Sequence, residues 1–256
     1  MIIILSANED PKYFEFWPIV SEAYRKMGYE CHLAFLTWRH PDSASVRYLQ
    51  KYGKVTTFKP QGDIAEFGQA KMIRFLLAAT YEDEVCYIDD IDLFPLSKAF
   101  IEDKVKQRPK DTLLCVGGEV YQNNGCYPVS QMTAEGNVWK QFINPGQIPY
   151  DHLMEQWSQP GMFDPMEDIS IKPDWSIWQC FSDEKLLRRL LFENPVPKFE
   201  LPRGYDNFME STLDRHDWKI DTGKLNNHGY VNAHCLRPYN AIAMAPLIQY
   251  INANYP

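Results

Sequence analysis

The chain has 256 residues, of which 45% are hydrophobic and 23% are charged, and this balance predicts one globular domain without large disordered parts. Its formal net charge of -8 and its pI near 5.3 argue against a nucleic-acid partner, because an acidic surface repels phosphate backbones. No stretch reaches the roughly 18 apolar residues that would span a bilayer, and the first residues lack the pattern of a signal peptide. We therefore expect a cytoplasmic protein without a transmembrane segment.

The first third of the chain has the pattern of a βαβ unit. Short apolar runs at residues 2–5 and 31–37 predict two strands buried on both faces. Between them, apolar side chains recur at spacings of three and four and predict a helix: Phe16, Ile19, Val20, Ala23, Tyr24 and Met27.

The remaining elements follow from similar runs. We expect strands at residues 54–58, 85–88 and 113–116, and helices at residues 69–80 and 183–192, with a short helix around residues 247–251. Residues 120–175 are rich in Asn, Gly, Pro and Gln, which predicts a less regular lobe over the sheet, with a helix or strand indicated only at residues 139–143.

The six cysteines form no CxxC pair. Cys31, Cys86 and Cys115 lie inside apolar runs, so we expect buried thiols in a reducing compartment rather than a disulfide framework or a zinc site.

An acidic cluster follows the strand expected at residues 85–88. Ligands of open α/β sheets bind outside the carboxyl ends of strands, which makes Asp89, Asp90 and Asp92 candidates for a site. Asp90 and Asp92 flank one residue, so in an extended segment both side chains point the same way and can share a divalent cation. The alternative is a solvated turn. The apolar residues on both sides favour the cation, which would relieve the repulsion between carboxylates.

Two segments carry a resemblance to a known family. Gln-Ala-Lys-Met-Ile-Arg-Phe-Leu at residues 69–76 and Val-Cys-Tyr-Ile-Asp-Asp-Ile-Asp at residues 85–92 resemble the helix and DxD motif of GT-A glycosyltransferases. The similarity is greatest to the glycogenin and galactosyltransferase-like group and to small transferases of large algal viruses. It implies one α/β GT-A domain over residues 1–256, with a mixed, mainly parallel sheet flanked by helices. Residues 1–118 would bind the nucleotide-sugar, and residues 119–256 would form the irregular acceptor side.

Later segments resemble the same family more faintly. Asn124, within Asn-Asn-Gly at residues 123–125, is similar to a segment that borders the donor sugar, and Asp174 lies where the family has an acidic residue facing the sugar. His-Cys-Leu-Arg-Pro-Tyr at residues 234–239 resembles a late His followed by a basic-Pro-aromatic triplet. By this resemblance His234 would be the third metal ligand and Arg237 a diphosphate contact. The spacing is shorter than in the family, and His228 competes with His234.

The other candidates come from their positions along the chain. Lys71 and Arg74 are three apart on one helical face and could reach a donor, although exposed basic residues are usually solvated. Asn8 and Asp63 follow expected strands and could bind base or ribose. An inverting reaction would need a carboxylate near the acceptor, with Asp174 or Asp183 first in line. Plain alternatives are a helix N-cap for Asp174 and, favoured for Asp183, a macrodipole contact in a first helical turn.

The function that this pattern predicts is transfer of a sugar from a nucleotide-sugar, with a UDP-sugar favoured by the resemblance, to a glycan or glycoprotein acceptor. Asp90, Asp92 and His234 would hold Mn²⁺ or Mg²⁺, which would act as a Lewis acid on the leaving nucleotide. The resemblance leans to retention of configuration. One alternative is a metal-dependent nucleotidyl or phosphoryl transferase, although the chain lacks a GxxxxGK[ST] loop and a GxGxxG turn. Another is a carbohydrate-binding protein without turnover.

Overall fold

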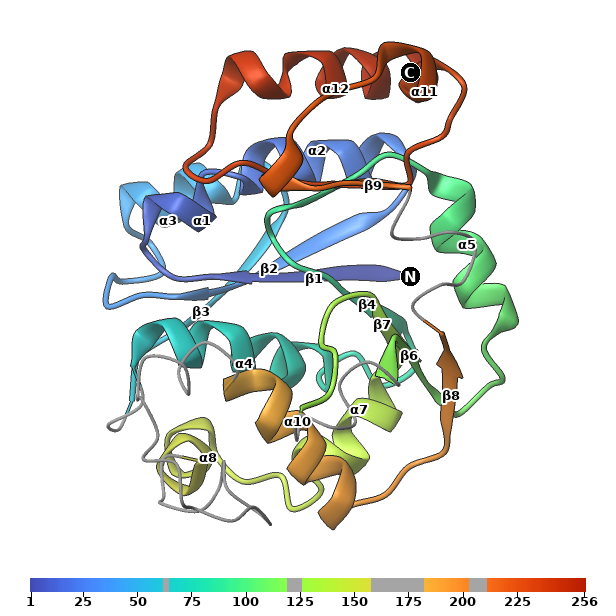
Figure 1. Ribbon diagram of the computed structural model, residues 1–256. Helices are drawn as coiled ribbons and strands as arrows, with labels where there is room; N and C mark the ends of the chain where they lie inside the picture. The colour runs from blue at the N-terminus through green and yellow to red at the C-terminus, as the bar shows by residue number, and fades with distance from the viewer. Residues whose placement is uncertain (62–64, 119–125, 158–181, 203–210) are drawn as a thin grey trace, which may run out of the picture.

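The computed structural model describes residues 1–61, 65–118, 126–157, 182–202 and 211–256. Helices cover both faces of a central sheet, as Figure 1 shows. Three predicted site residues, Asp63, Asn124 and Asp174, lie outside the described residues. No helix within the described ranges is long and apolar enough to cross a membrane.

The central sheet has seven strands in the order β3-β2-β1-β4-β7-β6-β8. Strand β1 pairs in parallel with both β2 and β4, so Ile3 lies between Cys31 and Tyr87. Strand β7 is antiparallel to β4 and β6, whereas β6 and β8 are parallel. The strands are β1 (Ile2–Ala7), β2 (Glu30–Leu36), β3 (Lys54–Phe58), β4 (Val85–Ile88), β6 (Leu113–Val116), β7 (Met132–Glu135) and β8 (Lys198–Leu201).

The helices form a layer on each side of this sheet (Figure 1). One layer contains α1 (Pro11–Phe14), α2 (Trp17–Lys26), α3 (Ala44–Leu49) and α12 (Ala241–Asn254). The other contains α4 (Glu66–Ala78), α7 (Gly136–Ile143), α8 (Tyr150–Trp157) and α10 (Ser182–Glu193). Helix α5 (Lys98–Gln107) lies toward the β6 and β8 side.

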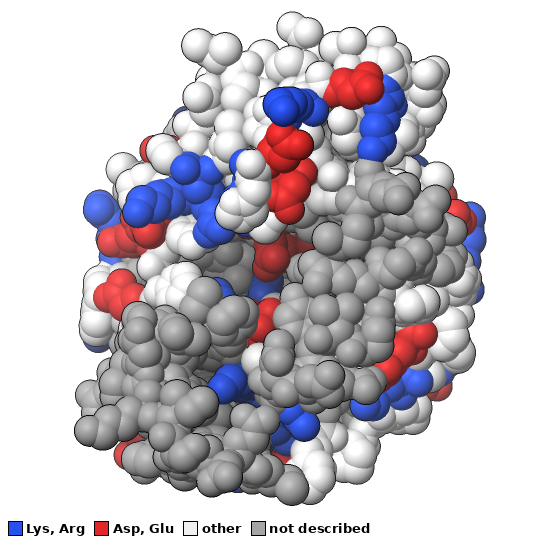
Figure 2. All heavy atoms as spheres, in the orientation of Figure 1, with Lys and Arg blue, Asp and Glu red and all other residues white. Residues whose placement is uncertain are grey.

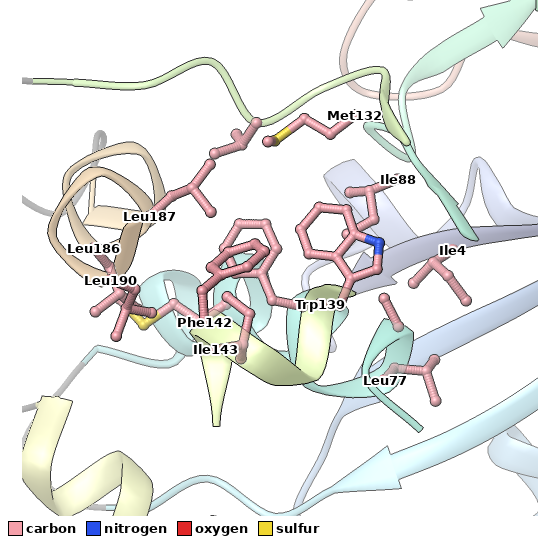
Figure 3. Close-up of a cluster of buried hydrophobic side chains, with 14 of the residues drawn as sticks. Ile4, Leu77, Ile88, Met132, Trp139, Phe142, Ile143, Leu186, Leu187 and Leu190 are labelled. Carbon is pink, nitrogen blue, oxygen red and sulfur yellow. The ribbon is translucent and has the colours of Figure 1, made fainter. Parts of the chain in front are cut away.

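Each layer encloses its own hydrophobic core. On the α4 side, Trp139 and Phe142 of α7 meet Ile4 and Ile88 of the sheet and Leu187 of α10, as Figure 3 shows. On the α2 side, Trp17 and Tyr24 pack with Leu33 of β2 and Leu247 of α12. The alternation of inward side chains along β1 and β2 supplies both cores from the same strands.

A second, three-stranded sheet joins the C-terminal part of the chain to the segment after β4. Strand β10 (Asn232–His234) lies between β5 (Leu93–Pro95), to which it is antiparallel, and β9 (Thr212–Leu213), to which it is parallel. The backbone N–H of Cys235 donates to the carbonyl of Asp92 at 2.8 Å. A 3₁₀ turn, η3 (Arg215–Asp217), follows β9, and α11 (Thr222–Asn226) precedes β10. This small sheet brings the predicted ligand His234 beside the acidic cluster.

Most of the predicted elements are confirmed. The strands expected at residues 54–58, 85–88 and 113–116 have those bounds, and the helix expected at residues 69–80 runs over Glu66–Ala78. The expected short C-terminal helix extends over Ala241–Asn254. All five described cysteines are free and buried.

The prediction of an irregular lobe is wrong for residues 132–138 and 150–157, whereas the regular element indicated at residues 139–143 is confirmed as part of α7. These residues form β7, α7 and α8, and β7 is part of the central sheet. The short strand has a polar sequence, Met-Thr-Ala-Glu, that gives little sequence signal. Its buried Glu135 is held by two hydrogen bonds from Arg108, at 2.6 and 2.7 Å, so the polar residue is accommodated by a partner far away in the sequence.

Candidate functional site

The acidic cluster lies where the connections of the sheet change direction. From β1 the chain continues outward through β2 and β3, whereas β4 pairs with the opposite edge of β1. Such a switch point, at the carboxyl ends of neighbouring strands, is the usual ligand site of open α/β sheets. A pocket of about 70 Å³ opens there, and the residues that line it include Asn8, Tyr13, Lys71, Arg74, Asp90 and Asp92. On the face drawn in Figure 2, acidic and basic side chains alternate along a hollow in the middle of the molecule.

Arg74 of α4 connects the acidic cluster to α10. Its Nη1 donates to Asp90 Oδ1 at 2.7 Å and to the carbonyl of Asp89 at 3.2 Å, and its Nη2 donates to Asp183 Oδ2 at 2.7 Å. The Arg74 side chain is only 4% exposed. Burial by itself would raise the pKa of Asp90, but the charge and the hydrogen bond of Arg74 outweigh it, and the pKa of Asp90 is lowered. Asp90 is therefore ionised in its pocket.

Asp183 lies behind Arg74. Its side chain is 1% exposed, and its second oxygen is 3.3 Å from Lys71 Nζ. Each carboxylate oxygen of Asp183 thus faces a basic group, and the contact with Arg74 holds that side chain in place. The structure gives Asp183 a positioning role, and its direct participation in catalysis stays a prediction. Lys71 and Arg74, predicted as donor contacts, both line the pocket.

The three aspartates after β4 have different environments. Asp89 points away from Arg74 and accepts a hydrogen bond from Tyr24 of α2 at 2.7 Å. Burial, with a smaller contribution from Asp90, raises the pKa of Asp89 to about 7. Asp89 is therefore a structural link to α2, whereas Asp90 and Asp92 line the pocket.

Asp92 accepts contacts from two arginines. Its Oδ2 lies 2.9 Å from Arg215 Nη1, 3.1 Å from Arg237 Nε and 3.8 Å from His234 Nε2. The Asp92 side chain is only 7% exposed. Arg237 also lies over the ring of Tyr13 and donates to its hydroxyl at 2.5 Å. The predicted diphosphate contact Arg237 is thus fixed between α1 and Asp92.

The two candidate histidines are in different places. His234 lies beside Asp92, and burial lowers its pKa, with Arg215 and Arg237 adding to this effect against the opposite influence of Asp92. A neutral imidazole is the form that binds metals. His228 instead lies beside α12, where its Nδ1 is 2.5 Å from the hydroxyl of Tyr250. Of these two histidines, His234 is the one beside the acidic cluster.

The predicted metal ligands contact arginines in this structure. Within the described ranges, no three His, Cys, Asp or Glu side chains are grouped closely enough to hold a metal ion. Asp90 faces Arg74, and Asp92 faces Arg215 and Arg237. The donor set, two carboxylates and one neutral imidazole, has the chemistry that Mn²⁺ or Mg²⁺ requires, so the metal remains a prediction.

Two residues of the site are not predicted from the sequence. Arg215 and Tyr13 contact Asp92 and Arg237, respectively. Arg215 is 123 positions from Asp92, and no local pattern connects them. Tyr13 lies in the first turn after the β1 segment, and its proximity to the predicted Asn8 is a signal that could have identified it.

Comparison with known proteins identifies the fold. The chain matches no known family profile and no curated sequence. Among solved structures, the glycosyltransferase GlyE of Streptococcus pneumoniae TIGR4 superposes with a TM-score of 0.51 and 10% identity, over 98% of this chain and 63% of the GlyE chain. The galactosyltransferase LgtC, in complex with donor and acceptor sugar analogues, has a TM-score of 0.46 and 11% identity, over 99% of this chain and 96% of LgtC.

The likeness to GlyE confirms the predicted GT-A type of α/β fold. This chain spans 63% of the length of GlyE. At such low sequence identity the comparison identifies the fold alone, and the function is argued from the site.

Proposed function

We propose that the protein transfers a sugar from a nucleotide-sugar donor, with a UDP-sugar favoured, to a hydroxyl group of a glycan or glycoprotein acceptor. The observation that carries this proposal is the pocket at the switch point, where Asp90 and Asp92 lie among basic side chains. A nucleotide-sugar leaves a diphosphate behind, and stabilising its negative charge is the main electrostatic task of the reaction.

The residues of the pocket suit the parts of such a donor. Asn8, at the carboxyl end of β1, would bind the base or the ribose. Lys71 and Arg74, from α4, and Arg237, from the C-terminal segment, would face the diphosphate. Because Asp183 and Tyr13 hold Arg74 and Arg237 in place, their charges are oriented before the donor arrives.

A divalent cation is part of the proposal. Asp90, Asp92 and His234 would hold Mn²⁺ or Mg²⁺, which when bound would supply Lewis-acid stabilisation of the departing nucleotide diphosphate. The burial of His234 keeps its ring neutral and able to donate its lone pair.

Calorimetric titration tests the proposal. The protein is titrated with UDP, with GDP and with their common sugar conjugates, each with Mn²⁺ and with EDTA. We expect one nucleotide family to bind more tightly with Mn²⁺, and donor hydrolysis without acceptor to require the metal. Release of a nucleoside diphosphate identifies sugar transfer, whereas release of a monophosphate or pyrophosphate would indicate nucleotidyl transfer.

The variant Asp92→Asn provides the internal test. It should lose the Mn²⁺ dependence of nucleotide binding, because an amide oxygen is a far weaker ligand than a carboxylate. Glu30→Gln is a matched control, since Glu30 is exposed at the start of β2, at the amino ends of the strands and away from the pocket. Absence of binding by every nucleotide would contradict the proposal.

A further inference from the structure

Arg215 occupies a place at the site that no sequence pattern indicates. It begins the η3 turn after β9, where the carboxylate of Asp214 accepts a hydrogen bond from the backbone N–H of His216 at 2.8 Å and fixes the turn. The Arg215 side chain is 12% exposed, and its Nη1 donates to Asp92 Oδ2 at 2.9 Å. The guanidinium is therefore held at the acidic cluster by a buried carboxylate.

Among the described residues, the ion pairs of Asp92 contain more positive than negative groups. Asp90 and Asp183 face Arg74 and Lys71, so two negative groups meet two positive groups there. Asp92 alone faces both Arg215 and Arg237, so one negative group meets two positive groups. This part of the site is suited to one further anion, in a protein whose formal net charge is -8.

The hydrogen-bonding capacity of Arg215 leads to the same conclusion. A guanidinium has five N–H donors in a planar fork that matches a phosphate group. Within the described part of the chain, Arg215 makes a single hydrogen bond, the one to Asp92. Its other nitrogen atoms lack a hydrogen-bond partner among the described residues but are not buried, so they reach solvent and are open to a ligand. Asp92 thus orients the fork and leaves most of its donors available.

We infer that Arg215 binds the diphosphate of the nucleotide-sugar donor and that Asp92 positions it for this contact. This inference rests on the proposed function for the identity of the ligand. Arg237, held by Asp92 and Tyr13, contacts the same carboxylate oxygen of Asp92 as Arg215 and would contact the same diphosphate. The diphosphate would accept hydrogen bonds from the same two guanidinium groups that contact Asp92. Hydrogen bonds between charged groups are stronger than those between neutral groups.

The test measures binding of inorganic pyrophosphate and, separately, of UDP, by calorimetry in EDTA, so that arginine contacts are read without a metal. Three variants are compared with the wild type. Arg215→Met removes the charge and the fork, and Arg215→Lys keeps the charge alone. Arg25→Met makes the same charge change at an exposed site on α2, 64% exposed and paired with Glu22. Thermal unfolding of each variant shows that it is folded.

We expect Arg215→Met to weaken pyrophosphate binding about tenfold or more, which is the size of effect that one charged hydrogen bond has on an affinity. The affinity of Arg215→Lys for pyrophosphate should lie between those of Arg215→Met and the wild type. Arg25→Met should bind pyrophosphate like the wild type. Pyrophosphate binding that is absent in the wild type, or unchanged in folded Arg215→Met, would overturn the inference. If pyrophosphate binding depends on Arg215 but no nucleotide binds even when Mn²⁺ replaces EDTA, the anion site stands and the proposed sugar transfer fails.

Discussion

Replacement of Arg74 by methionine should destabilise the protein far more than an exposed arginine would. The Arg74 side chain is 4% exposed and bridges Asp90 and Asp183 at 2.7 Å each. Without it, Asp90 can still be hydrated, because its side chain is 41% exposed. Asp183 cannot be hydrated at 1% exposure and would retain only Lys71, at 3.3 Å. Breaking a buried ion pair on one side typically costs about 3–5 kcal/mol.

Urea unfolding, followed by circular dichroism, measures this loss. A decrease of about 3–5 kcal/mol should lower the melting temperature by roughly 6–20 °C in a chain of this size. Arg25→Met is the matched control, because Arg25 is 64% exposed and forms an i,i+3 pair with Glu22 on the surface of α2. That change should leave the free energy of unfolding nearly unchanged.

The double variant Arg74→Met/Asp183→Leu shows how much of the lost stability comes from the broken ion pair and how much from lost packing of the Arg74 side chain. Removing the stranded carboxylate should restore a large part of the free energy of unfolding, since the penalty comes from an uncompensated buried charge. Two results would refute the reasoning: a loss below about 1 kcal/mol in Arg74→Met, or a double variant less stable than the single one.

Two further predictions concern stability away from the pocket. Gly136→Ala should cost about 2 kcal/mol or more in urea unfolding, because the added Cβ would overlap the carbonyl oxygen of Tyr81, whereas Gly146→Ala should be nearly neutral, with its nearest new contact at 3.5 Å. Burial, and to a lesser degree Lys54, lowers the pKa of His32 to about 4 from 6.5, so between these pH values the unfolded chain binds a proton that the folded chain refuses. Stability should therefore fall by up to about 3 kcal/mol as the pH drops from 6.5 to 4, and His32→Gln, measured in the same titration, should lose this part of the pH dependence. An equal pH dependence in both proteins would contradict the assignment.

The sequence predicts the elements whose character is local. Strands β3, β4 and β6 have the bounds that the sequence predicts, because each is a short run with turn residues around it. Strand β10 is three residues long and pairs with β5 and β9, which are distant in the sequence, so a local sequence pattern cannot predict it. Strand β7 has polar residues at buried positions, and its stability depends on Arg108, which is 27 positions from Glu135.

The same division applies to the site. Asp90 and Asp92 could be proposed from one segment, because their spacing and the preceding strand are visible together. The partners of these carboxylates could not, since Arg74 and Asp183 are 109 positions apart and Arg215 and Asp92 are 123 apart. Asp183 shows the limit of a local signal: its place in the first turn of α10 is visible in the sequence and is confirmed, whereas its ion pair with Arg74 is not visible there.

These long-range pairs connect the completion of the site to the docking of the C-terminal segment. Arg215 follows β9, and His234 and Arg237 lie at the end of β10 and just beyond it, so all three reach Asp92 only when β10 has paired with β5. When β10 docks, Asp92 exchanges water for these basic groups and becomes nearly buried, at 7% exposure. Docking of β10 thus assembles the groups that we assign to the diphosphate. A donor that binds them should therefore slow amide exchange in β10 as well as at the pocket, because it stabilises the docked state over the open one.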